Sequence, residues 1–71
     1  MPVPMTYAQI ADDLAARIKG GEYAAGAKLP SYNQLGELYS VGFSTIAKAV
    51  ALLRDRGVVI GAPGRGVYVA D

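Results

Sequence analysis

The sequence contains neither cysteine nor histidine. Without cysteine, the chain forms no disulfide and no thiolate metal site. Without histidine, it lacks the commonest general base, the commonest metal ligand and the side chain that ordinarily titrates near neutral pH. The adjacent carboxylates Asp12 and Asp13 would diverge on a helix, which does not suit shared acid–base catalysis. We therefore predict no enzyme activity, no catalytic residues, no cofactor and no metal site.

Long apolar runs and a large excess of one charge are also missing. Seven Lys or Arg residues stand against six Asp or Glu, so the net charge is only +1, less basic than is usual for a DNA-binding protein. No apolar run is long enough to span a membrane, and the first residues lack the basic start of a signal peptide. Hydrophobic residues make up 52% of the chain and charged residues 18%, which predicts a folded, cytoplasmic domain without membrane contact.

The first segment with helical spacing covers about residues 6–19. Thr6 and Gln9 form a capping box at its start, and Gly20 follows its end. One face carries apolar residues at spacings of three and four, as an amphipathic helix requires. These residues are Tyr7, Ile10, Leu14 and Ile18.

Two further helical segments follow a glycine-rich loop. Ser31 and Gln34 form a second capping box at the start of a helix at about residues 31–39. After an interruption at residues 40–42, helical spacing resumes at about residues 43–56 and ends before Gly57, where a left-handed cap is expected. Two helices joined by such a short connection form a helix-turn-helix.

The end of the chain has the composition of a β-hairpin. Strands are expected at about residues 58–61 and 66–69, which are rich in β-branched and aromatic residues. The turn between them contains Gly64, Arg65 and Gly66, so the hairpin has a flexible tip with one cation. Pro30 favours an extended conformation at Leu29, and residues 28–29 are therefore expected to supply a very short strand.

Four motifs, in order and at consistent spacing, resemble the N-terminal DNA-binding domain of the GntR family of bacterial regulators. They cover nearly the whole chain, together with Tyr7-x-x-Ile10 at its start. This resemblance implies a mainly α domain with a small β-hairpin, a winged helix-turn-helix of three helices plus a β wing, over residues 1–71. The motifs are Leu29-Pro30-Ser31, Leu35-x-x-Leu38-Tyr39-x-Val41, Ala49-x-x-Leu52-Leu53-x-x-x-Gly57 and Gly64-x-Gly66-x-Tyr68-Val69.

The resemblance also implies sequence-specific binding to double-stranded DNA by a transcription regulator, most often a repressor. The third helix is expected in the major groove, and the hairpin is expected to act as a wing on the backbone or minor groove. Family members usually bind palindromic operators as homodimers and carry a C-terminal effector-binding domain. No such domain and no small-molecule effector site is evident in this chain. Ala11, Ala15 and Ala16 of the first helix form a candidate dimer surface.

The residues that the resemblance places against DNA form three groups, at the start of the second helix, at the front of the third helix and at the wing tip. We expect Ser31 to act first as a helix cap, with any phosphate contact additional. Arg65 supplies the cation that a phosphate or a narrow minor groove attracts. The groups are Ser31, Tyr32 and Asn33; Gly42, Phe43, Ser44, Thr45 and Lys48; and Gly64, Arg65 and Gly66.

The chain departs from the family pattern where basic residues are usual. Tyr32 and Asn33 replace an acidic and then a basic residue, Phe43 replaces an arginine, and Ala47 replaces another commonly basic residue. A basic side chain that pairs with guanine supplies roughly 1–3 kcal/mol of discrimination, which these positions cannot provide. Lys48 is left as the cation early in the third helix.

Two interpretations of these departures are open. In one, Phe43 contacts a thymine methyl group, while Ser44, Thr45 and Asn33 read A·T-rich base edges. In the other, DNA binding has weakened, and the fold serves as a protein-interaction module. We favour the first because Lys48, the basic wing tip and its glycines are present.

Several of these residues also have a purely structural interpretation. Phe43 directly precedes the helix, where an apolar residue can instead pack into the core. Among the tyrosines, Tyr32 is expected to be exposed, and Tyr7, Tyr39 and Tyr68 are expected in the core. Arg54 and Arg56 are expected to be solvated at a helix end, where the helix dipole favours cations.

Overall fold

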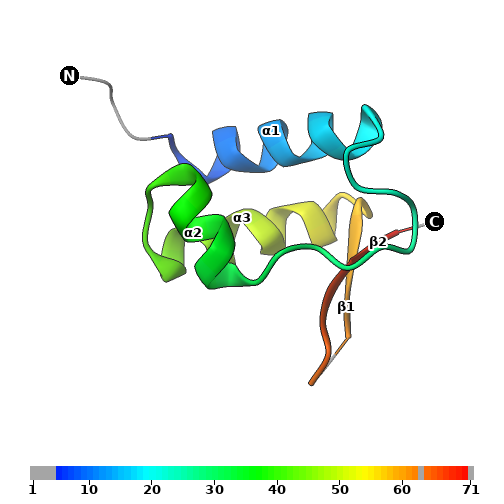
Figure 1. The fold of residues 1–71 in the computed structure, drawn as a ribbon. Coiled ribbons are helices and arrows are strands. Elements are labelled where there is room, and N and C mark those ends of the chain that lie inside the picture. Colours follow the sequence, from blue (N-terminus) through cyan, green and yellow to red (C-terminus); the bar gives the residue numbers. More distant parts are fainter. Residues whose placement is uncertain (1–4, 63, 71) are drawn as a thin grey trace.

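The computed structural model describes residues 5–62 and 64–70, so residues 1–4, 63 and 71 of the expected domain lie outside the described residues. Three helices precede a two-stranded antiparallel sheet (Figure 1). The expected fold class is confirmed. The first strand starts one residue later than expected, at Val59, and the third helix ends at Asp55 with Arg56 as its cap. The elements are α1 (Tyr7–Lys19), α2 (Tyr32–Tyr39), α3 (Phe43–Asp55), β1 (Val59–Ala62) and β2 (Gly66–Val69).

The helices α1 and α2 begin at the two capping boxes expected from the sequence. The Thr6 hydroxyl accepts a hydrogen bond from the Gln9 backbone N–H at 3.2 Å, and the Gln9 side chain accepts one from the Thr6 N–H at 2.9 Å. Ser31 and Gln34 repeat this arrangement at 3.1 and 2.9 Å. Within the described residues, α3 has no such side-chain cap at Gly42. The positive end of its dipole is therefore left open.

The core lies between α1 and α3 and extends to α2 and β1. Figure 1 shows α1 lying along α3, with α2 at one end of this pair and the hairpin at the other. Burying each large apolar side chain contributes about 1.5–3 kcal/mol, so this core is the main source of stability. No described helix combines the length and the apolar character needed to cross a membrane. The largest fully buried side chains are Ile10, Leu14, Leu35, Ile46, Val50, Leu53 and Val59.

A tight turn joins α2 to α3. Ser40 adopts a left-handed conformation with φ 56°, and the Val41 N–H donates to the Gly36 carbonyl at 3.0 Å. Gly36 is buried, and a Cβ atom on it would lie only 2.9 Å from the Val41 carbonyl oxygen. The close packing of the turn against α2 therefore depends on the missing side chain at Gly36.

The hairpin is attached to the loop that precedes α2. In the sheet, Val59 lies opposite Val69, and Ala62 lies opposite Gly66. The expected short strand at residues 28–29 is reduced to a single bridge between Lys28 and Tyr68, and the Leu29 N–H donates to the Val67 carbonyl at 2.8 Å. This attachment fixes the base of the hairpin while its tip extends from the domain (Figure 1).

One expectation about the first helix is wrong, and another is wrong for one of its three residues. Tyr7 is 45% exposed, and it lies at the first position of α1, at the edge of the packed helix. Ala11 is fully buried in the core of a single chain, so it cannot contribute to a dimer surface. Tyr39 packs against the core as expected, and Tyr68 is partly buried.

Candidate nucleic-acid interface

The front end of α3 lies at the surface. Phe43, its first residue, is 60% exposed, and Gly42 and Ser44 on either side are exposed as well. Thr45 is half-buried, because it lies nearer to the core-facing side of the helix. The alternative that placed Phe43 in the core is therefore wrong.

Tyr32 positions the Phe43 ring. The two ring centroids lie 5.2 Å apart, and the ring planes are tilted by 50°. Such tilted aromatic contacts are favourable because the edge of one ring meets the electron-rich face of the other. Tyr32 also packs against the core, so it is less exposed than the sequence suggested. Ser31 and Asn33, on either side of it, are exposed at the start of α2.

The wing tip presents Gly64, Arg65 and Gly66 to solvent. The Arg65 N–H donates to the Ala62 carbonyl at 2.9 Å, which closes the turn. Gly66 has φ 119°, and a Cβ atom there would lie 2.8 Å from Cε of Lys28. This positive φ favours glycine over residues with a side chain. The short distance shows that the Lys28 side chain lies directly beside the wing.

Lys48 lies on a different side of α3 from the groove next to the wing. It is exposed one helical turn after Ser44 and borders a shallow hollow that it shares with Tyr7 and Asp55. The structure therefore brings together the starts of α2 and α3, and Tyr32 with the wing. Lys48 stands apart on the outer face of α3.

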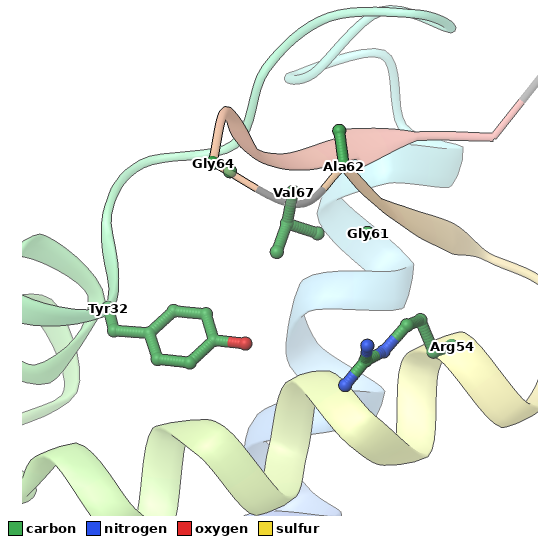
Figure 2. Close-up of a pocket in the computed structure, with 7 residues that line it drawn as sticks. Tyr32, Arg54, Gly61, Ala62, Gly64 and Val67 are labelled. Carbon is green, nitrogen blue, oxygen red and sulfur yellow. The ribbon is translucent and has the colours of Figure 1, made fainter.

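A groove of about 290 Å³ separates α3 from the wing. Tyr32 lies at one end of it and Arg54 at the other (Figure 2). Arg54 is exposed at the end of the helix, as expected from the sequence, but its place beside this groove was not predicted. Its spacing of seven residues from Ala47 already placed both on the same helix face. The groove is lined by Tyr32, Arg54, Gly61, Ala62, Gly64, Gly66 and Val67.

Among the cations that form no ion pair with a described residue, four lie on α3, on the hairpin or beside it, and Lys19 lies at the end of α1. Arg17 pairs with Asp13 at 2.8 Å and with Glu22 at 3.0 Å, while Arg56 pairs with Asp12 at 2.7 Å, all of them involving α1 or the residues after it. The other five cations form no ion pair within the part of the chain that the structure describes. Exposed carboxylates near α3 are Glu37 and Asp55. The five cations are Lys19, Lys28, Lys48, Arg54 and Arg65.

A polar cluster links α1 to α2. The Tyr39 hydroxyl donates to the Asp13 carboxylate, which also accepts from Arg17 Nε at 2.8 Å. These hydrogen bonds, first from Tyr39 and then from Arg17, lower the pKa of Asp13. Burial, together with the bond to Asp13, raises the pKa of Tyr39. Both groups keep their ordinary charge states at neutral pH, so the cluster joins two helices and has no reactive group.

Nothing in the described part of the chain resembles a metal centre, since no three acidic side chains gather there. The exposed front of α3, the groove beside the hairpin and Arg65 at the wing tip are the features of this surface that can meet a partner. A family model described as "Bacterial regulatory proteins, gntR family" matches residues 6–69.

The chain belongs to the GntR family.

Relatives of this GntR-family domain include the HTH-type transcriptional repressor NagR of Bacillus subtilis. NagR is 32% identical over 69 residues, which is 97% of this chain and 28% of NagR. Among solved structures, Streptococcus agalactiae GntR matches with a TM-score of 0.82 and 40% identity over 92% of this chain and 32% of that one. The chain therefore spans about a third or less of these two relatives.

The DNA-binding domain of AraR in complex with operator ORE1 is also similar to the GntR-family domain described here. The TM-score is 0.86 and the identity 30%, over 99% of this chain and 83% of the AraR chain. Both structural matches support the winged helix-turn-helix architecture.

Proposed function

We propose that this GntR-family domain binds double-stranded DNA sequence-specifically, with α3 in the major groove and the wing on the backbone or the adjacent minor groove. The observation that carries the proposal is the exposed front end of α3, which is uncapped by any described side chain and contacts, through Phe43, the Tyr32 ring that lines the groove beside the hairpin. The similar AraR domain was solved in complex with an operator, which supports DNA binding by this fold. The proposed contact residues are Ser31, Tyr32, Asn33, Gly42, Phe43, Ser44, Thr45, Lys48, Gly64, Arg65 and Gly66.

The proposal extends to the role of the whole protein. We infer a transcription regulator without catalytic activity that acts in the cytoplasm as a repressor, as the name of NagR suggests. A homodimer on a palindromic operator fits the size of the domain, because one small module contacts too few base pairs for useful selectivity. Ala11 is buried and cannot take part in the dimer contact, whereas Ala16 on the same helix is exposed.

Titration into labelled duplex DNA at two salt concentrations tests the proposal. Contacts between Lys or Arg and phosphates release counterions, so affinity is expected to fall as salt rises. Absence of binding even at low salt would favour the protein-interaction alternative. Random-sequence selection of duplexes with the same protein then identifies the preferred site.

Replacing Lys48 by alanine is expected to weaken binding to the selected site by about tenfold, the order of one charged hydrogen bond of ~1.5 kcal/mol. Lys48 is exposed on the outer face of α3. The matched control is Arg17→Ala, which removes a cation that two carboxylates already neutralise. Equal losses of affinity in fluorescence-anisotropy titrations of the two variants would contradict the assignment of α3.

The aromatic residue at the front of α3 leads to a prediction about the bases that are read. If Phe43 contacts a thymine methyl group, replacing that thymine by uracil is expected to weaken binding about fourfold, the value of one buried methyl group of ~0.8 kcal/mol. Phe43→Ala should bind the thymine and uracil duplexes equally. The control Leu38→Ala removes another exposed apolar side chain and should keep the discrimination. Discrimination that survives in Phe43→Ala would refute the contact.

A further inference from the structure

Arg54 and a glycine of the hairpin face each other across the groove between α3 and the wing. The Arg54 side chain lies close to Gly61, where a Cβ atom would come within 3.2 Å of Nη1 and 3.6 Å of Cδ. In Figure 2 the Arg54 guanidinium and the Tyr32 hydroxyl reach into the same space from opposite ends. One charged group and one hydroxyl group therefore face a single hollow.

The charge of Arg54 is not neutralised by any carboxylate in the part of the chain that the structure describes. Arg56, only two residues later on the same helix, pairs with Asp12 at 2.7 Å and so serves the contact with α1. The described residues give Arg54 no ion pair and no hydrogen bond. An unpaired guanidinium beside a groove is well suited to a phosphate, because it donates two parallel hydrogen bonds to the phosphate oxygens.

The geometry of duplex DNA determines which part of the duplex lies over this groove. A single backbone strand separates a major groove from the adjacent minor groove. With α3 in one groove and the wing in the other, that strand crosses the gap between them. The glycines Gly61, Gly64 and Gly66 form the hairpin wall of the gap, and their lack of side chains lets a backbone approach closely.

We propose that the groove between α3 and the wing binds one phosphate of this strand, with Arg54 as the cation and the Tyr32 hydroxyl as a second donor. The proposal rests on the DNA-binding function inferred for the domain. Arg54 also bears on the positions where this chain lacks the basic residues that are usual in the family. Ala47 is uncharged, and Arg54, two turns later on the same face of α3, places a cation nearer to the wing.

The slope of affinity against salt tests this site directly. Each phosphate contact contributes about 0.9 to the slope of log K against log salt, so Arg54→Gln is expected to reduce its magnitude by roughly that amount. A fourfold rise in salt should then cost Arg54→Gln about 3.5-fold less affinity than it costs the wild type. The weakening should be similar on selected and unrelated duplexes, because a phosphate carries no base identity.

Two matched variants complete the experiment. Arg56→Gln makes the same change of charge on the same helix and should keep the wild-type slope, because Arg56 points to α1. Arg54→Lys keeps the charge in the groove and should retain the wild-type slope as well. Circular dichroism melting checks that each variant is folded at the temperature of the titration.

The outcomes separate this proposal from the proposed function. A wild-type protein that binds DNA with a salt-dependent affinity, while Arg54→Gln keeps its slope, would overturn the phosphate site alone. Equal changes of slope in Arg54→Gln and Arg56→Gln would also overturn it, since they would reflect net charge. A wild-type protein that binds no duplex would remove both the site and the function on which it rests.

Discussion

Replacing Leu14 by alanine is expected to destabilise the domain by about 2–5 kcal/mol. Leu14 is fully buried on the face of α1 that packs in the core. The truncation leaves a cavity between helices that cannot collapse without disturbing the other buried side chains. Domains of this size have stabilities near the low end of about 5–15 kcal/mol, so the replacement removes much of the total.

Thermal unfolding followed by circular dichroism measures this effect. Each kcal/mol lowers the melting temperature of a domain of this size by about 4–8 °C, so a fall of at least about 8 °C is expected for Leu14→Ala. Leu38→Ala is the matched control, because the same atoms are removed from a side chain that is 50% exposed. Its cost should be less than about 1 kcal/mol. Similar melting temperatures for the two variants would show that α1 does not pack against the core as described.

Replacing Gly36 by alanine is expected to destabilise the domain by about 1–3 kcal/mol, the usual cost of overpacking. In an ordinary helix interior the same replacement stabilises by ~1 kcal/mol, so the expected sign is reversed. The reason is steric: the new Cβ atom would lie 2.9 Å from the Val41 carbonyl oxygen, which belongs to the backbone of the turn. That oxygen moves only if the turn between α2 and α3 moves with it.

Gly42→Ala is the control for Gly36→Ala. Gly42 has an ordinary negative φ of −78°, and a Cβ atom on it would have no neighbour within 4 Å. Its replacement should cost less than about 1 kcal/mol, the difference between glycine and alanine as an N-cap. Urea unfolding of both variants gives the two free energies. A Gly36→Ala protein as stable as the wild type would mean that the turn has room to relax.

Features decided by near neighbours in the chain were predictable from the sequence. The capping boxes at Thr6 and Ser31 depend on residues three positions away, and both form as expected. The turn at residues 40–42 and the hairpin follow from the change in apolar spacing and from the glycines. Because these rules act over one or two helical turns, they do not require knowledge of the tertiary structure.

Features decided by distant neighbours were not predictable in the same way. Tyr7 lies on an apolar period, yet it is exposed, because the period does not say where the covering layer ends. Tyr32 is partly buried because Phe43 meets it from another helix. Arg54 reaches the groove only because the hairpin folds back over α3 and presents Gly61 to it.

The sequence predicted which elements form the site but did not predict where the charged side chains lie. A net charge of +1 is weak support for a DNA-binding role. The fold separates the cations by their partners, because Arg17 and Arg56 form ion pairs with carboxylates of α1 or with Glu22 in the loop after it. The cations near α3 and the wing form no ion pair with a described residue, so the local charge there is more positive than the net charge of the chain suggests.

The purely apolar core has a practical consequence for how the molecule responds to its medium. The described interior contains no charged side chain, and the three ion pairs lie near the surface, where solvent and salt screen them. Added electrolyte screens attraction to a polyanion but hardly weakens contacts between hydrocarbon groups. A rise in ionic strength is therefore expected to weaken attachment to a duplex while the domain stays folded and ready to bind again.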